Sequence, residues 1–240
     1  MACPESGAFT GFAESTLRFL TEIRSHNDRE WFEAHRTEYE QYVLTPLRAL
    51  VLDLGPCMSD IDHEFELRPA VGRTISRIHR DTRFSFDKSP FRSTVWITFK
   101  RPSHEWLDRP VYFFELAGDT FRYGMGFYSA KPRTMERIRD RVTRDPAEFL
   151  AAVAFYPGQD VFAIEGATYK RRIANTLPQE IQTWYQRKNL YLSSNHAADA
   201  RLLCSDLACE LCAGFRMLAP LYRFLLAASA RDTLEDAWRP

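Results

Sequence analysis

The feature that most restricts the fold is a run of strand-like segments in the middle of the chain. Thr94–Phe99 reads TVWITF, in which apolar residues recur at every second position among β-branched and aromatic neighbours. Val111–Leu116 is apolar, and Phe121–Tyr128 follows it after the turn signal Gly118-Asp119. Connections this short join antiparallel neighbours. The middle of the chain therefore predicts an antiparallel meander.

Helical patterns lie on both sides of these strands. Apolar residues from Phe12 to Ile23 recur at the helical spacing, and Asp28 is placed as the N-cap of a second helix. A third helix is predicted to begin near Pro46 and to end at Gly55-Pro56. Asp145-Pro146-Ala147-Glu148 predicts a helix start, because it combines a capping acid, a proline at the first helical position and a glutamate three residues after the cap.

These patterns predict an α+β protein. Arg73–His79 is expected to add one more strand, giving an antiparallel β-meander of about four or more strands packed with N-terminal and C-terminal helices. No proline- or glycine-rich linker divides the sequence. Residues 1–240 are therefore expected to form a single compact domain, with residues 1–10 poorly ordered.

The sequence also predicts a compartment. The first ten residues contain neither a basic region nor an apolar run, so no signal peptide is expected. The apolar tail Leu218–Ala230 is interrupted by Pro220 and Arg223 and is too short to span a bilayer. We expect a cytoplasmic protein that binds no membrane.

Five cysteines without an export signal predict reduced thiols. Cys204, Cys209 and Cys212 have a spacing similar to an iron–sulfur ligand run. They lie in a strongly helical segment without a fourth ligand nearby. Buried helix cysteines are therefore expected, without a cofactor.

Charge is distributed unevenly although the net charge is zero. Residues 1–67 carry 13 acidic and 5 basic residues, whereas residues 68–101 carry 2 acidic and 9 basic residues. Acidic N-terminal helices that pack on the basic segment would account for this asymmetry. A zero net charge and a localised basic patch argue against strong binding of duplex nucleic acid.

The basic segment is the candidate site, and its cations need anionic partners. Arginine presents a fork of donors that matches phosphate or carboxylate oxygens. The expected anion-binding residues are Arg77, Arg80, Arg83, Lys88 and Arg92, and the expected supporting residues are Asp81, Asp87 and His79.

Two interpretations of this segment stay open. In the first, the loop 80–92 is held in a fixed conformation and binds an anionic, phosphate-bearing small molecule or nucleotide. In the second, the chain is a non-catalytic protein-interaction domain, and Asp81, Asp87 and acids of the first helices neutralise the loop as an internal ion-pair network. The sequence leaves open whether the chain is an enzyme, and its oligomeric state.

Other chemistry has weaker support. His79 beside Asp81 is more simply a hydrogen-bonded structural histidine than a general base, and no paired metal-ligand pattern exists, so no metal is expected. Trp31 lies among aromatic residues at helical spacing. Such residues are usually part of the core, and the alternative is a surface on which a base or a sugar stacks. Gly124-x-Gly126 lacks the third glycine of a dinucleotide fingerprint and predicts a bulge or a close approach of backbone.

A second basic group lies near the C-terminal part of the chain. It contains Lys170, Arg171 and Lys188. A solvated surface explains it without a function. If it lay beside the loop 80–92, the combined patch would suit a phosphate-rich ligand.

Several sequence blocks resemble a widespread microbial family known as domain of unknown function 2461. The block from Arg77 to Pro90, with its arginines, two aspartates and lysine, is the most specific part of the resemblance. The similar blocks are Leu20–Tyr39, Ser76–Arg92, Gly124–Tyr128, Arg133–Arg141 and, more weakly, Tyr169–Arg172 with Lys188. The resemblance implies a compact, soluble α+β domain and implies no established reaction.

Overall fold

A computed structural model gives the fold of residues 8–83, 85–103, 106–173 and 175–230. The chain folds into two compact units. Unit 1 comprises Met1–Pro102, Tyr112–Gly124 and Ser194–Arg216, and unit 2 comprises Ser103–Val111, Met125–Ser193 and Met217–Pro240. The single domain over residues 1–240 stays a prediction. Of residues 1–10, the first seven lie outside the described part, and the amides of Ala8 and Phe9 donate to the Asp53 carboxylate at 2.8 and 3.0 Å.

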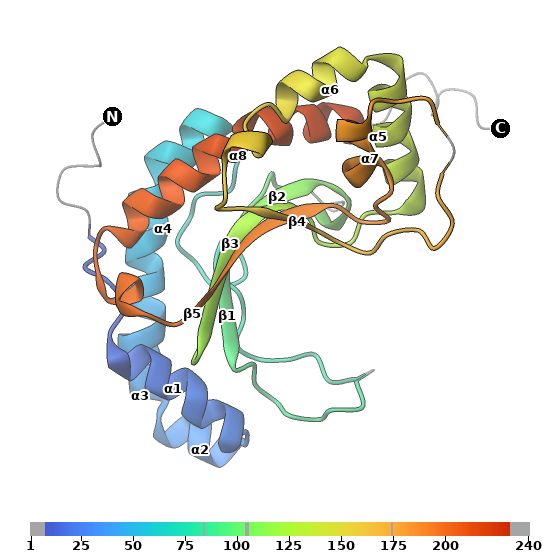
Figure 1. The fold of residues 1–240 in the computed structure, drawn as a ribbon. Coiled ribbons are helices and arrows are strands. Elements are labelled where there is room, and N and C mark those ends of the chain that lie inside the picture. Colours follow the sequence, from blue (N-terminus) through green and yellow to red (C-terminus); the bar gives the residue numbers. More distant parts are fainter. Residues whose placement is uncertain (1–7, 84, 104–105, 174, 231–240) are drawn as a thin grey trace. The chain divides into compact units, whose positions relative to one another are not determined.

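Five strands form one open antiparallel sheet, which confirms the α+β prediction. The strand order is β1-β2-β3-β5-β4 (Figure 1). Thr94 pairs with Ala117 and Phe99 with Tyr112, so β1 and β2 are in register along all of β1. The strands are β1 (Thr94–Phe99), β2 (Pro110–Ala117), β3 (Thr120–Phe127), β4 (Ala163–Glu165) and β5 (Tyr191–Ala197).

Helices precede and follow the strands in the chain. Unit 1 contains α1 (Glu14–Ser25), α2 (Arg29–Ala34), α3 (Arg36–Glu38), the π-helical turn η1 (Tyr39–Leu44), α4 (Thr45–Ile61) and η4 (Ala200–Leu203). Unit 2 contains η2 (Trp106–Asp108), α5 (Pro132–Arg144), α6 (Pro146–Ala152), η3 (Tyr156–Gly158) and α7 (Gln179–Tyr185). Residues of α8 (Leu207–Ser229) belong to both units.

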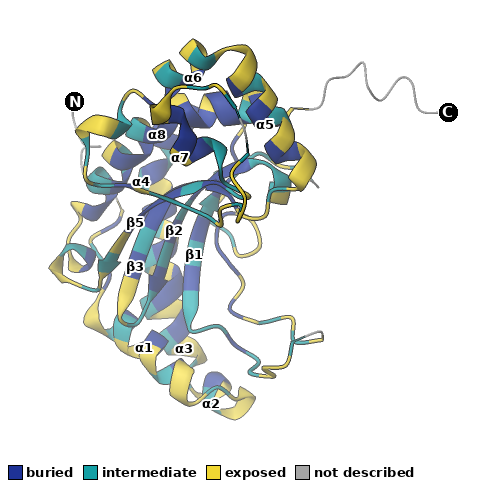
Figure 2. Ribbon diagram, turned by 45° about the vertical axis from the view of Figure 1, so that its right-hand side comes forward, coloured by how far each residue is buried: buried dark blue, intermediate teal, exposed yellow. Residues whose placement is uncertain are grey.

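The core of unit 1 is built on one face of the sheet. Val95, Ile97 and Phe99 are at most 1% exposed, whereas the alternate residues of β1 are half-buried. Figure 2 shows this alternation along β1. α4 packs against β1. The period of two in the sequence is therefore the period with which side chains enter the core.

Helix starts agree with the predicted caps, and one helix end does not. The Asp28 carboxylate accepts the Trp31 amide at 2.8 Å, and the Asp145 carboxylate accepts the Glu148 amide at 2.9 Å. The predicted stop at Gly55-Pro56 is wrong, because α4 continues to Ile61 with Pro56 inside it. Burial of the following apolar residues offsets the backbone hydrogen bond that a proline cannot donate.

Two predictions about strand backbone have different outcomes. Arg73–His79 is not a regular strand, since it makes only isolated bridges, such as Ile75 with Ile97. The predicted close approach of backbone is confirmed at Gly126, where a Cβ atom would collide with Tyr191.

The cysteine predictions need correction. Cys57 in α4 and Cys212 in α8 form a disulfide with a Cα–Cα distance of 6.1 Å, so they are not reduced thiols in this structure. Cys204 is an exposed thiol that precedes α8 instead of a buried helix residue. The sequence could not indicate the disulfide, because its two cysteines are 155 positions apart.

The longest helix has an apolar composition. Within the described residues, α8 alone is long and apolar enough to cross a membrane. More than half of its most apolar window is buried inside the protein, as is usual for a core helix. Length and composition therefore give only weak support to a membrane span.

Candidate anion-binding loop

The loop that carries the predicted site stands on a short hairpin stem in unit 1. His79 bridges Phe91 in antiparallel orientation. The Arg80 amide donates to the Pro90 carbonyl, and the Arg92 amide donates to the Ile78 carbonyl, both at 2.8 Å. Figure 1 shows the loop extending from the strands. The stem therefore fixes the two ends of the loop against each other.

Asn27 clamps this stem to the turn between α1 and α2. Its amide nitrogen donates to the Phe91 carbonyl at 3.0 Å, and its amide oxygen accepts the Phe91 amide at 2.9 Å. A single side chain thus satisfies both backbone groups of Phe91, as a neighbouring strand would. The Phe32 and Phe91 rings also stack with centroids 4.3 Å apart. The helix break after Ser25 is therefore part of the support of the loop.

Arg80 and Asp87 form an ion pair within the loop. The Asp87 carboxylate also accepts the Ser89 amide at 2.9 Å. Hydrogen bonds from Ser89 and Arg80 lower the pKa of Asp87. The Asp87 carboxylate therefore links Arg80, at the start of the loop, to Ser89, near its end.

Arg83 and Asp81 form a second ion pair. Arg83 Nε and Nη2 donate to the two Asp81 oxygens at 2.9 and 2.7 Å. Hydrogen bonds from Arg83 lower the pKa of Asp81 to about 2. Both aspartates thus accept hydrogen bonds from arginine side chains of the loop. The side chains of this pair are 78% and 58% exposed, so solvent weakens their attraction.

The other three cations have no carboxylate partner in the described part of the chain. Lys88 Nζ donates to the Thr82 carbonyl at 2.9 Å. The Arg92 guanidinium lies 4.8 Å from the centroid of the Trp96 ring, and exposed Arg77 lies beside Gly72. N-terminal acids pair with cations at the two ends of the basic segment, Glu66 with Arg68 and Asp62 with Arg101. The ion pairs described within the loop are formed by its own aspartates.

His79 packs among aromatic rings. Its ring centroid lies 5.8 Å from that of Phe32 and 5.0 Å from that of Phe91. No group of three or more histidine, cysteine or acidic side chains is arranged for a metal ion among the residues that the structure describes. His79 is exposed, and the contacts described for its side chain are with these rings, so the hydrogen-bonded structural role stays a prediction.

Aromatic side chains near the loop differ in exposure. Phe91 is buried, Phe86 is fully exposed, and Phe84 lies outside the described residues. Trp31 is half-buried and stacks on His35 with centroids 4.1 Å apart. Phe86 is therefore the described loop aromatic that solvent reaches.

The second basic group belongs to unit 2. Lys170 and Arg171 are exposed, and the Lys188 ammonium lies 5.4 Å from the centroid of the Tyr169 ring. The Lys188 amide donates to the Ala167 carbonyl at 2.7 Å. The backbone of Lys188 is therefore hydrogen-bonded to the segment that precedes Lys170 and Arg171.

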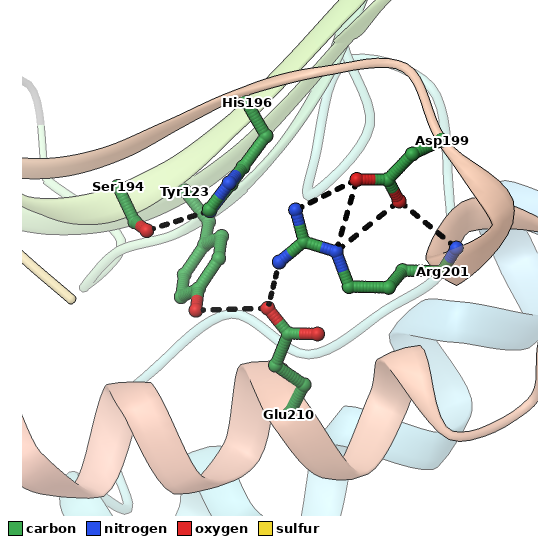
Figure 3. A network of polar contacts seen from close by, with 6 residues as sticks. All are labelled: Tyr123, Ser194, His196, Asp199, Arg201 and Glu210. Carbon is green, nitrogen blue, oxygen red and sulfur yellow. Dashed lines mark hydrogen bonds and ion pairs between the residues drawn. The ribbon is translucent and has the colours of Figure 1, made fainter.

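Unit 1 also contains a polar network that no sequence motif indicates (Figure 3). The Tyr123 hydroxyl and Arg201 Nη1 both donate to Glu210 Oε1, each at 3.2 Å. Arg201 also donates to both oxygens of Asp199. Burial raises the pKa of Tyr123 to about 12. These contacts join β3 to the start of α8 through residues that no local motif connects.

Ser194 and His196 extend this network on β5. Ser194 Oγ and His196 Nε2 are 2.7 Å apart, and burial lowers the pKa of His196. Ser194 is only 2% exposed, as is Tyr123. The network is therefore a largely buried set of polar contacts that ties β5 and β3 to the start of α8.

The fold and the loop define a class of α+β protein that has an open antiparallel sheet and a clamped basic hairpin loop. A family model described as a conserved hypothetical protein, DUF2461, matches residues 15–224. The chain belongs to this family, as the resemblance predicts. A search of curated proteins found no match.

Proposed function

We propose that the loop 80–92, together with Arg77 just before its stem, binds a phosphate-bearing small molecule or nucleotide. One observation carries the proposal: in the described structure Arg77, Lys88 and Arg92 have no carboxylate partner. A phosphate group supplies the missing negative charge, and arginine and lysine are its usual partners.

Arg80 and Arg83 have a different part in the proposal. Their ion pairs with Asp87 and Asp81 hold the loop in one conformation before a ligand arrives. A site that is already ordered loses less conformational freedom on binding. The clamp from Asn27 acts in the same direction at the base of the loop.

The competing function is a non-catalytic protein-interaction domain. The ion pairs within the loop and the exposed Phe86 ring favour it, because an aromatic side chain at a loop tip suits a protein interface. Both proposals concern binding, and neither assigns a reaction.

A thermal-shift screen of nucleotides and sugar phosphates tests the first proposal. At least one compound should stabilise the wild-type protein. Arg92→Gln should weaken its binding by roughly 10- to 100-fold, the effect of losing a charge-assisted hydrogen bond. Arg83→Ala should also weaken it, because the ion pair with Asp81 that holds the loop is lost. Arg18→Gln is the matched control, since Arg18 is an exposed cation on α1 outside the loop.

Two results would contradict the proposal. The first is a wild-type protein that no phosphate compound stabilises. The second is an Arg83→Ala protein that fails to fold, which would favour the ion-pair network of the competing function.

A further inference from the structure

A buried cation without a carboxylate partner lies in unit 2. Arg139 on α5 is only 7% exposed. Its Nη1 donates to the Arg187 carbonyl at 3.4 Å, and its guanidinium lies 5.5 Å from the centroid of the Tyr169 ring. No carboxylate among the described residues pairs with it. Removing a guanidinium from water without a counter-ion is costly, so this arrangement needs an explanation.

The backbone holds two partners of Arg139 in place. The Tyr169 amide donates to the Gln186 carbonyl at 3.0 Å, and the Lys188 amide donates to the Ala167 carbonyl at 2.7 Å. An antiparallel bridge between Thr168 and Arg187 lies between these two bonds. Because the Lys188 ammonium is 5.4 Å from the Tyr169 centroid, Arg139 and Lys188 lie around the same ring.

The surrounding segment adds positive charge without neutralising it. Residues 165–188 contain five basic and two acidic residues. Arg187 donates to the carbonyls of Gly166 and Thr183 at 2.6 and 3.2 Å, and not to a carboxylate. Lys170 and Arg171 are exposed on the same segment. The local field therefore favours an anion.

We infer that Arg139, Tyr169 and Lys188 form a second anion-binding site, which takes a phosphate group. The arginine supplies a fork of donors, the lysine supplies a compact charge, and a doubly charged phosphate matches the two cations. This site lies within unit 2 and uses no residue of the loop 77–92. The inference is therefore independent of the proposed function.

Isothermal titration of the full chain with inorganic phosphate and with pyrophosphate tests the inference. Arg139→Met and Lys188→Gln should each weaken binding of at least one of these probes by about tenfold or more, as expected for losing a charge-assisted contact. Arg144→Gln should leave binding unchanged, since Arg144 is an exposed cation at the end of the same helix. Repeating the titration in an Arg92→Gln background separates this site from the loop.

Thermal stability without phosphate distinguishes a binding role from a structural one. If Arg139 is retained for an anion, Arg139→Met should fold and melt at or above the wild-type temperature, because a buried charge without a counter-ion has been removed. If Arg139→Met fails to fold, Lys188→Gln decides the question, since Lys188 is exposed. Wild-type protein that binds neither probe, or binding that Lys188→Gln does not weaken, would overturn the inference.

Discussion

The clamp between Asn27 and Phe91 allows a quantitative test of how the loop is supported. Asn27→Ala removes two hydrogen bonds, and it leaves the N–H and C=O groups of a residue that is 2% exposed without this partner. Two bonds at about 1 kcal/mol each, together with the penalty for unpaired buried groups, give a loss of roughly 2–4 kcal/mol. For a chain of this length the melting temperature should fall by roughly 5–15 °C.

Urea denaturation of wild type and Asn27→Ala measures this loss, and hydrogen exchange of the Phe91 amide locates it. Asn27→Asp is the matched control, because the carboxylate can accept the Phe91 amide but cannot donate to its carbonyl. Asn27→Asp should therefore also be less stable than wild type, because a carboxylate oxygen then faces the Phe91 carbonyl oxygen. Equal unfolding free energies for wild type and Asn27→Ala, with unchanged protection of the Phe91 amide, would refute the clamp.

Three further predictions follow from the described contacts. Reduction of the Cys57–Cys212 disulfide should lower stability by up to about 5 kcal/mol from chain entropy; non-reducing mass spectrometry that finds both Cys57 and Cys212 as free thiols would contradict the bond. Burial raises the pKa of Tyr39 to about 12, which favours the neutral phenol in the folded protein. The contribution of the raised Tyr39 pKa to the free energy of unfolding is complete below about pH 10 and is lost as the pH rises to about 12. Between these pH values the free energy of unfolding should fall by up to roughly 2.7 kcal/mol less in Tyr39→Phe than in wild type. Equal pH dependence of unfolding in both proteins would be inconsistent with this pKa. Duplex DNA should bind weakly at physiological salt, and a gel-shift titration with submicromolar, steeply salt-dependent affinity would disprove this.

Local sequence signals predict the parts of this protein that depend on neighbouring residues. The alternation in Thr94–Phe99 predicts β1 because every second side chain enters the core. The close spacing of Asp81 and Asp87 to loop arginines similarly predicts the ion pairs. In β1 the signal is a period of two along the chain, and in the loop the paired residues are only two and seven positions apart.

Contacts between distant residues could not be predicted. Asn27 and Phe91 are 64 positions apart, and a lone asparagine in a helix break gives no sign of its partner. Residue type alone does not indicate the burial of Arg139, because Arg133 and Arg144 on the same helix are exposed. Pro56 shows the opposite error: a local stop signal is overridden by the packing of the residues that follow it.

The central claim, that the loop binds a phosphate-bearing ligand, is tested most directly by mapping backbone amide chemical shifts while a nucleotide or sugar phosphate from the screen is added. We expect saturable shifts at residues 77–92, and we expect these shifts to be lost in the Arg92→Gln protein. Saturating ligand that leaves residues 77–92 unshifted, or shifts that remain unchanged in Arg92→Gln, would contradict it.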